Sequence, residues 1–302
     1  MNYQHAFHAG NFADVHKHAV LARILVHLRR KPAAFRVIDT HAGAGRYDLL
    51  AAEPDRSGEW RGGIKRVWDA PPPRYPPPQA GEGSLIFPSP QAGEGRVGAL
   101  LAPYLDAVAA LNRDGELRTY PGSPLIAQSL LRPQDRLIAC EIEPRSAALL
   151  AAALRGDRRA KALAIDGWTA LGAYVPPKER RGLVLVDPSF EDAADFMRLS
   201  GGLAAAHRKW PTGIYMLWYP IKAREAPDAL ARRLQRLAIA KVLRCEIMLG
   251  PPRADAGLVG SGLIVVNPPF TLDPELRILL PALGRMLSPQ AAPRLDWLTP
   301  DR

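Results

Sequence analysis

Short apolar runs that each end in an acidic residue recur along the chain. They close at Asp39, Glu141, Asp166 and Asp187, and the last of them is Leu183-Val184-Leu185-Val186. Continuous apolar runs are typical of strands buried on both faces of a parallel sheet. The carboxyl ends of such strands meet at one edge of the sheet, where ligands bind. The pattern therefore predicts an open α/β sheet with four carboxylates at its ligand-binding edge.

The periodicity around these runs agrees with a doubly wound sheet. Apolar residues recur at helical spacing within 13–31, which predicts a helix directly before a first strand at 35–39. Strand and helix patterns then alternate from about 121 to 225. Lys241–Met248 and Gly262–Val266 look like two more strands. They would suit a terminal antiparallel pair on the parallel sheet.

This alternation breaks after the first strand. In a compact nucleotide-binding unit the second strand begins about 20 to 30 residues after the glycine turn, whereas here the gap is several times longer. We therefore expect an inserted helical subdomain at 46–120, with helices near 60–69 and 99–112. The main domain would then consist of residues 1–45 and 121–302.

A repeat lies inside this insertion. The sequence Pro78–Gly83 recurs as Pro90–Gly95, and the stretch 71–97 around it is rich in proline and glycine. Such a segment cannot bury a core, so we expect a flexible loop. A tolerated surface insertion is favoured over an RNA-contacting arm, because loops accept extra length at little entropic cost.

Composition narrows the class of protein. The 302 residues carry a formal charge of +10, which favours a polyanionic partner such as nucleic acid, although a compositional bias toward arginine would give the same excess. Cys140 and Cys245 lie in apolar runs and predict neither a disulfide framework nor a zinc site, in keeping with a cytoplasmic location. No apolar stretch could span a bilayer and no signal peptide is evident, so no membrane association is expected. No oligomer signature is visible, so we expect a monomer.

The turn after the first strand indicates the cofactor. Gly43 and Gly45 let the backbone approach a ligand closely, but Asp48 stands where a dinucleotide fingerprint needs its third glycine. No P-loop motif is present either. A cofactor without a pyrophosphate fits this turn, and we infer S-adenosylmethionine.

The acidic strand ends suit the polar groups of that cofactor. Asp39 could accept from the methionine ammonium, directly or through water, Glu141 from the ribose hydroxyls, and Asp166 from the adenine amino group. Any one such residue is more often a helix cap than a ligand. Four in series strengthen the assignment.

The turn Asp187-Pro188-Ser189-Phe190 indicates an amine substrate. Methylation of an exocyclic amine requires acceptors for its two N–H groups, which the Asp187 carboxylate and the Pro188 carbonyl could supply. Phe190 could stack on an extruded base. Asn267-Pro268-Pro269-Phe270 matches the motif of amino-methyltransferases more closely. It follows the last predicted strand, however, so the earlier turn is preferred.

Several longer motifs are more specific than these turns. They are Tyr3–Asn11, Ala13–His18, Asp39–Tyr47, Tyr120–Ala127 and Gly213–Pro220. Together they resemble the RlmJ family of 23S ribosomal RNA adenine-N6 methyltransferases, and the resemblance covers nearly the whole chain outside roughly 70–98. It implies a Rossmann-like class I S-adenosylmethionine-dependent methyltransferase fold with an inserted small helical subdomain. It also implies 23S rRNA as partner, protein-free or in an early assembly intermediate.

The resemblance also implies roles for individual residues. It makes Asp187 the catalytic residue and places Tyr3 and His5 on the substrate side, on an N-terminal segment that closes over the site. The family turn is Asp-Pro-Pro-Tyr, so Ser189 and Phe190 are departures that lose rigidity and a hydroxyl but keep the aromatic face. The cofactor-binding positions implied by the family are Lys17, His18, His41, Ser123, Glu141, Asp166 and Gly167.

Three alternatives stay open at this point. The histidines at 5, 8, 16 and 18 could form a metal cluster, but no carboxylate or cysteine stands at a usual ligand spacing, so no metal is expected. A non-catalytic RNA-binding homologue with a decayed turn would explain Ser189. A DNA adenine methyltransferase is disfavoured because no separate target-recognition domain is evident.

Overall fold

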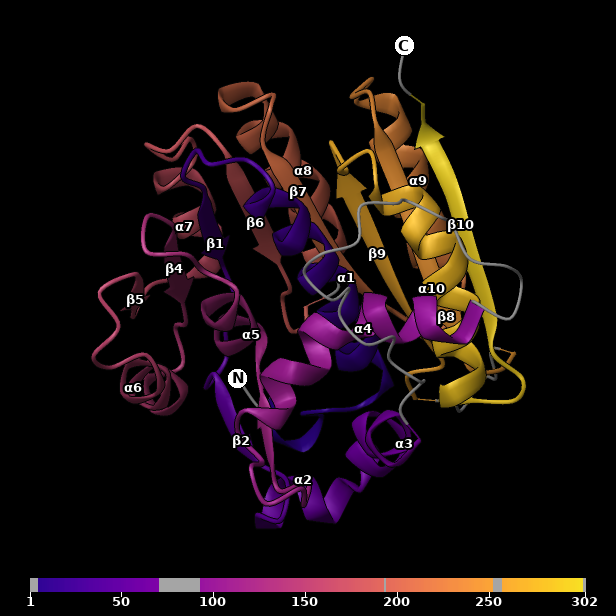
Figure 1. Cartoon of the computed structure of the whole chain (residues 1–302). Coiled ribbons are helices and arrows are strands. Elements are labelled where there is room, and N and C mark those ends of the chain that lie inside the picture. The colour runs from indigo at the N-terminus through magenta and orange to yellow at the C-terminus, as the bar shows by residue number, and fades with distance from the viewer. Residues whose placement is uncertain (1–4, 71–92, 193, 252–256, 301–302) are drawn as a thin grey trace, which may run out of the picture.

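An eight-stranded sheet forms the centre of the protein in the computed structural model, which describes residues 5–70, 93–192, 194–251 and 257–300 (Figure 1). The strand order is β10-β8-β9-β7-β6-β1-β4-β5. The neighbouring pairs from β5 to β7 are all parallel. These five strands are β1 (Arg36–Asp39), β4 (Arg136–Cys140), β5 (Ala160–Leu163), β6 (Gly182–Val186) and β7 (Ile214–Ile221).

The sheet continues beyond β7 with antiparallel pairs. β9 (Gly260–Val266) lies between β7 and β8 (Val242–Met248) and runs antiparallel to both. The predicted strands at 241–248 and 262–266 are therefore present. The sequence did not predict β10 (Ala292–Thr299), which pairs antiparallel with β8 at the edge.

Helices cover both faces of the sheet (Figure 1). One face packs against α7 (Gly167–Ala173), α8 (Asp195–Lys209) and α9 (Glu225–Arg236), which share a core with β6 and β7. The other face carries a larger core, built on α1, α4, α5 and α10. Their bounds are Phe12–Arg29, Gly93–Ala109, Ser123–Ser129 and Leu272–Leu287, and α6 spans Pro144–Ala153.

Helix α1 is buried around nearly its whole circumference, including the charged and polar side chains of Asp14, His16, Lys17, His18 and Arg23. It agrees with the helix predicted at 13–31. Buried charges require partners, so α1 is expected to contribute polar groups to a site rather than only apolar contacts.

The segment between β1 and β4 leaves the main domain and returns to it at neighbouring positions. There the Gly122 N–H donates to the Gly45 carbonyl over 2.8 Å. Two short strands that the sequence did not predict, β2 (Arg46–Asp48) and β3 (Thr119–Pro121), pair there. The helical part comprises α2 (Ala52–Ser57), a 3-10 turn at Glu59–Gly62, α3 (Ile64–Asp69) and α4. A further 3-10 turn, His5–Phe7, precedes α1.

The prediction of a flexible loop at 71–97 is wrong at the C-terminal end of that range. Residues 93–97 belong to α4, which begins within the second copy of the repeat, at Gly93. Residues 71–92 lie outside the described residues. Helix propagation from the apolar face of α4 extends the helix into the glycine-containing stretch, where composition alone favours a loop.

Candidate active site

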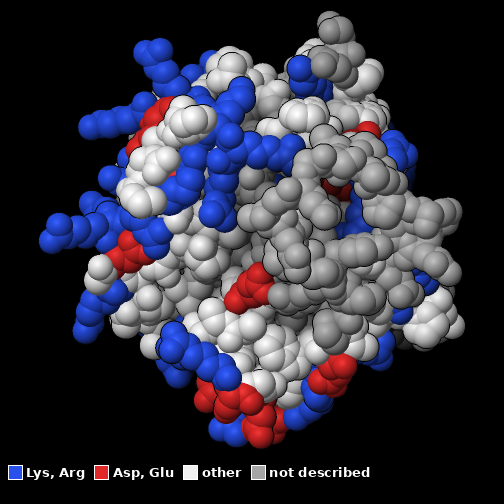
Figure 2. Space-filling view, in the orientation of Figure 1, with Lys and Arg blue, Asp and Glu red and all other residues white. Residues whose placement is uncertain are grey.

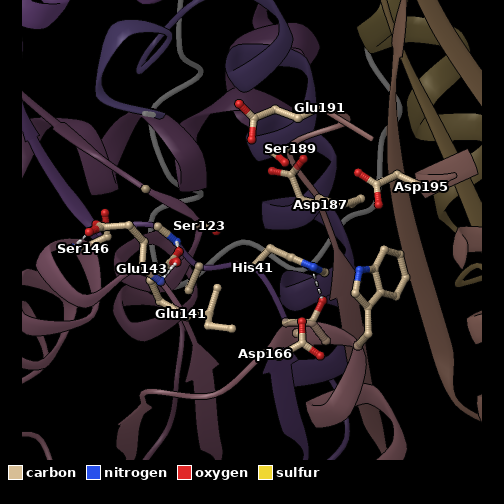
Figure 3. A pocket seen from close by; sticks show the side chains of 18 of the residues that line it. His41, Ser123, Glu141, Glu143, Ser146, Asp166, Asp187, Ser189, Glu191 and Asp195 are labelled. Carbon is tan, nitrogen blue, oxygen red and sulfur yellow. Dashed lines mark hydrogen bonds between the residues drawn. The ribbon is translucent and has the colours of Figure 1, made fainter. Parts of the chain in front are cut away.

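A cavity of about 340 Å³ opens at the carboxyl edge of the parallel strands, the edge predicted to bind ligands (Figure 3). Its volume lies within the range typical of small-molecule sites. The structure gathers most of the predicted residues there from α1, α5 and the turns that follow β1, β4, β5 and β6. The predicted residues among the lining are Lys17, His18, His41, Gly43, Ser123, Glu141, Asp166, Gly167, Asp187 and Pro188.

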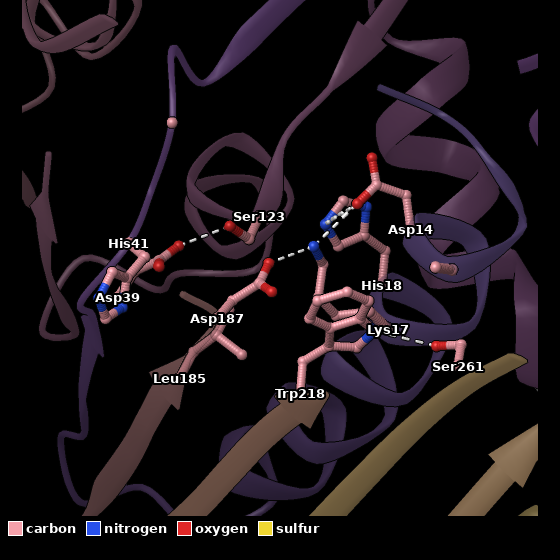
Figure 4. A network of polar contacts seen from close by, with 12 residues as sticks. Asp14, Lys17, His18, Asp39, His41, Ser123, Leu185, Asp187, Trp218 and Ser261 are labelled. Carbon is pink, nitrogen blue, oxygen red and sulfur yellow. Dashed lines mark hydrogen bonds and ion pairs between the residues drawn. The ribbon is translucent and has the colours of Figure 1, made fainter. Parts of the chain in front are cut away.

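Lys17 connects α1 to the turn after β6 (Figure 4). Its Nζ forms ion pairs with Asp187 Oδ2 and, over 2.8 Å, with Asp14 Oδ1, and it lies 5.8 Å from the centre of the Trp218 ring. Burial alone would lower the pKa of Lys17, but the two carboxylates outweigh burial and raise it. Lys17 is therefore a fixed cation that holds one oxygen of Asp187 in place.

Asp39 lies directly behind the cavity wall, 1% exposed. Its Oδ2 accepts from the Ser123 hydroxyl over 2.6 Å, whereas Oδ1 is buried without a hydrogen-bond partner among the described residues. Burial raises the pKa of Asp39 to about 7, and the negative charge of Asp187 adds to this, against the Ser123 hydrogen bond. An unsatisfied buried carboxylate oxygen suits a cationic ligand group.

The glycine turn and Glu141 hold each other. Gly43 has a φ of +62°, a conformation that favours glycine, and its N–H donates to Glu141 Oε2 over 2.9 Å. The other oxygen, Oε1, accepts from the Glu143 N–H over 2.8 Å. The carboxylate is thus oriented by two backbone donors, which leaves its remaining lone pairs for the hydroxyls of a ligand.

The turn after β5 packs closely against the turn after β1. Asp166 caps α7 by accepting from the Thr169 N–H over 2.8 Å, and it also lines the cavity. The same carboxylate is therefore both a helix cap and a candidate ligand. A Cβ on Gly167 would lie 2.3 Å from the Thr40 carbonyl oxygen, so only glycine fits. The His41 ring stands edge-on to Trp168, with ring centres 5.2 Å apart.

His41 is held as a neutral ring. Its Nδ1 lies 2.8 Å from the Thr40 hydroxyl. Burial lowers the pKa of His41 to about 4, against the opposing charges of Asp187 and Asp166. A neutral imidazole beside the cavity can exchange hydrogen bonds with a ligand without adding charge to it.

The aromatic residue of the Asp-Pro-Ser-Phe turn does not line the cavity. Phe190 adopts a φ of +53° and packs between Phe196 and Trp218, with ring centres 4.8 and 5.6 Å away. The two residues that precede it in the turn, Pro188 and Ser189, do line the cavity. In this conformation the ring packs on two aromatic neighbours and does not line the cavity, so its stacking role stays a prediction.

The competing Asn-Pro-Pro-Phe turn lies at the other edge of the sheet. Because β9 is antiparallel to β7, its carboxyl end reaches the amino end of β7. There the Asn267 side-chain amide donates to the carbonyls of Pro211 and Gly213 over 2.7 and 2.8 Å. Asn267 therefore supports a turn, and the preference for Asp187 agrees with the geometry.

The N-terminal histidines are dispersed. His8 pairs with Glu59, His16 Nδ1 lies 3.0 Å from Ser261 Oγ, and His18 Nδ1 lies 2.7 Å from the Tyr120 hydroxyl. No group of three His, Cys, Asp or Glu within the described ranges is placed to hold a metal ion. Tyr3 and the side chain of His5 lie outside what the structure describes.

Sequence reasoning missed two residues of the site. Asp14 shares Lys17 with Asp187, and Trp168 packs against His41 at the cavity wall. The Asp14–Lys17 spacing of three residues was the available signal for Asp14, but such pairs are usually exposed on helix surfaces. For Trp168, its position after the Asp166-Gly167 turn was the signal.

Comparison with known proteins supplies the family. The model described as "Ribosomal RNA large subunit methyltransferase D, RlmJ" matches residues 32–73 and 93–299. The chain belongs to the RlmJ family. Two RlmJ relatives, ribosomal RNA large subunit methyltransferase J of Escherichia coli K12 and of Haemophilus influenzae, are 37% and 35% identical to it, each over 100% of both chains.

One solved structure matches along almost the whole chain. The crystal structure of a Legionella pneumophila protein is 30% identical, covers 96% of this chain and 98% of its own, and superposes with a TM-score of 0.82. Family membership and the strand order confirm the predicted Rossmann-like class I methyltransferase fold. The protein is a methyltransferase of a family that modifies ribosomal RNA.

Membership of the RlmJ family also implies use of S-adenosylmethionine. The cavity fits that cofactor in the chemistry of its polar groups. Behind its wall lies a buried Asp39 oxygen that has no hydrogen-bond partner among the described residues, and Glu141 and the glycine turn line it. None of the helices in the described ranges has the length and apolar character that a membrane crossing requires.

Proposed function

We propose that the protein transfers the methyl group of S-adenosylmethionine to the exocyclic N6 of a specific adenine in 23S rRNA. The observation that carries this is the Lys17–Asp187 ion pair at the cavity, at the end of β6. It supplies an oriented acceptor for an amine beside a site suited to the cofactor. That the protein acts in the cytoplasm as a monomer stays a prediction from the sequence.

The cofactor would be held by the first three strand ends. Glu141 would accept from the ribose hydroxyls, Asp166 from the adenine amino group, and Asp39 from the ammonium, directly or through a water. Lys17, His18, His41, Gly43 and Gly167 would complete the pocket. When bound, the cofactor supplies the electrophilic methyl group.

Asp187 would then orient the substrate. One of its oxygens is held by Lys17, and the other forms no ion pair among the described residues, so it can accept an amine N–H. The Pro188 carbonyl would accept the second N–H and direct the nitrogen lone pair at the methyl group. Acceleration would come mainly from holding the two reactants in line. Tyr3, His5 and Phe190 would contact the extruded base.

Nucleoside analysis tests the reaction. Labelled S-adenosylmethionine is incubated with the protein and with rRNA from cells that lack this gene, and the digested product is separated. We expect N6-methyladenosine in the large-subunit RNA and none with duplex DNA as acceptor. Incorporation into DNA in preference to RNA would contradict the proposal, and cofactor binding without any incorporation would favour a non-catalytic RNA-binding protein.

Asp187→Asn tests the assigned role. The amide keeps the shape of the side chain but cannot serve Lys17 as an anion, so we expect turnover to fall at least 100-fold while cofactor affinity changes by less than about tenfold. Ser189→Ala, in the same turn, is the matched control and should keep most of the activity. Equal losses of turnover and cofactor affinity in Asp187→Asn would contradict a role in orienting the substrate.

A further inference from the structure

The Asn-Pro-Pro-Phe turn presents an exposed aromatic ring. Phe270 is 81% exposed, and its ring stands edge-on to His27 with centres 5.3 Å apart. Asn267 fixes this turn through its two hydrogen bonds to the carbonyls before β7. An aromatic ring held out from a fixed turn offers a flat apolar face to a partner.

Exposed cations also lie at the amino edge of the parallel strands. Within the described chain none of them forms an ion pair, and they come from the end of α1, the loop before β6 and the end of α8. Lys and Arg side chains gather on the upper and left part of the face drawn in Figure 2. We name as the amino-edge surface Arg29, Arg30, Lys31, Lys178, Arg180 and Arg208.

Hydrogen bonds join these segments into one surface. Arg132 and Arg181 donate to the carbonyls of residues 28–33, which ties the end of α1 to the loops before β4 and β6. Lys178 and Arg180 line one shallow depression with Trp210. The positive charges of Arg30, Lys31 and Arg181 add to burial in lowering the pKa of His27, the residue that contacts Phe270.

Carboxylates do not neutralise this edge. Asp135, Asp157 and Glu179 lie there, and each is engaged by an arginine: Arg132, Arg159 and Arg36. Glu141, Glu143 and Asp166, which form no ion pair among the described residues, line the methyl-transfer cavity at the opposite edge. A polyanion is therefore attracted to the amino edge.

We propose that the amino-edge surface is a second RNA-binding surface, on which Phe270 stacks an unpaired base and the cations contact phosphates. Base stacking on an exposed aromatic residue beside a cationic track is how proteins hold single-stranded RNA. The inference rests on the proposed function, because it takes the RNA that is methylated as the occupant.

The two sites lie at opposite ends of the same strands. A five-residue strand spans roughly 16 Å, and the turns at either end add to this separation. One nucleotide cannot reach both, so the amino-edge surface contacts RNA outside the segment that carries the methylated base. A short hairpin bound at the cavity would leave it empty.

Binding of two RNAs tests the proposal without requiring turnover. Affinity is measured against salt for protein-free 23S rRNA and for the shortest hairpin that contains the modified adenine. For Arg29→Gln/Arg30→Gln/Lys31→Gln we expect about tenfold weaker binding of the long RNA and a salt slope smaller by about 2. Phe270→Ala should weaken the long RNA about tenfold with an unchanged slope. Neither should alter hairpin binding.

Matched variants control for charge and apolar exposure. Arg96→Gln/Arg232→Gln/Arg285→Gln removes three exposed arginines from α4, α9 and α10, and Leu149→Ala removes an exposed apolar side chain from α6. Both should bind the two RNAs like the parent. Equal losses of affinity for the long and the short RNA in the amino-edge variants overturn the proposal. Unchanged affinity for both RNAs also overturns it and points to an acidic protein partner. Methyl incorporation, followed separately, reports on the proposed function alone.

Discussion

Asp39→Asn is expected to stabilise the cofactor-free protein at alkaline pH, although Asp39 lies at the centre of the proposed cofactor site. The pKa of Asp39 is raised to about 7 from its ordinary 3.8, mainly by burial. The unfolded chain ionises this group near its ordinary pKa, so the folded state binds the proton more tightly. The stability that this group contributes is therefore present below about pH 4 and is lost as the pH rises to about 7.

The magnitude follows from the two pKa values. Their difference of about 3 corresponds to about 4 kcal/mol of lost stability above pH 7. Asparagine keeps the Ser123 hydrogen bond and carries no charge, but its buried amide N–H groups need acceptors, which costs about 1–2 kcal/mol. A net gain of about 2–3 kcal/mol raises the Tm of a chain of this length by about 3–5 °C.

Urea unfolding at pH 4, 6 and 8 checks this expectation. The variant should be no more stable than the parent at pH 4 and should gain steadily on it up to pH 8. Asp135→Asn is the control with the opposite sign: burial would raise the pKa of Asp135, but Arg132 holds it below its usual range, so its loss should destabilise the protein at pH 8. A difference between Asp39→Asn and parent that does not vary with pH would refute the reasoning.

Cofactor binding should reverse the effect at Asp39. A ligand ammonium near Asp39 favours its ionised form, so binding near pH 7 should release about half a proton, because the group is half protonated there. Calorimetry in buffers of different ionisation enthalpy measures this number. Asp39→Asn should release none and should bind the cofactor at least tenfold more weakly. Proton release that persists in the variant would assign it to another group.

Three further substitutions probe the supports of the site. Lys17→Met removes the cation shared by Asp14 and Asp187 and should lower the free energy of unfolding by about 3 kcal/mol, with Lys17→Arg losing less in urea titrations. Gly167→Ala brings a Cβ within 2.6 Å of His41 Nε2. It should lower the free energy of unfolding by about 1–3 kcal/mol and should also weaken cofactor binding measurably. Glu275→Gln weakens the buried pairing with Arg23 and should cost about 3 kcal/mol while the cofactor dissociation constant, measured by calorimetry, stays unchanged.

The carboxyl edge of the sheet could be predicted because its features are local in sequence. An apolar run followed by an acidic residue identifies both a buried strand and a side chain at its end, and Asp39, Glu141 and Asp187 directly end or follow their strands. The order of the runs then placed them at one edge, since parallel strands share a direction.

Other features depend on distant partners. Strand β10 lies at the sheet edge with most of its residues partly or fully exposed, so it lacks the continuous apolar run of a central strand. β2 and β3 are each three residues long, too short to show alternation. The direction of Phe190 depends on its positive φ and on two aromatic neighbours, neither of which is local sequence information.

The burial of α1 has a consequence for the synthesis of the protein. Lys17, His16 and Arg23 find their partners 170, 245 and 252 residues later in the chain, at Asp187, Ser261 and Glu275. At translation rates of about 5–20 residues per second, the helix emerges roughly 10–50 s before its last partner is made. The first helix translated is thus among the last to be enclosed. A nascent chain therefore carries an exposed apolar helix and no assembled site until nearly its last residues have left the ribosome.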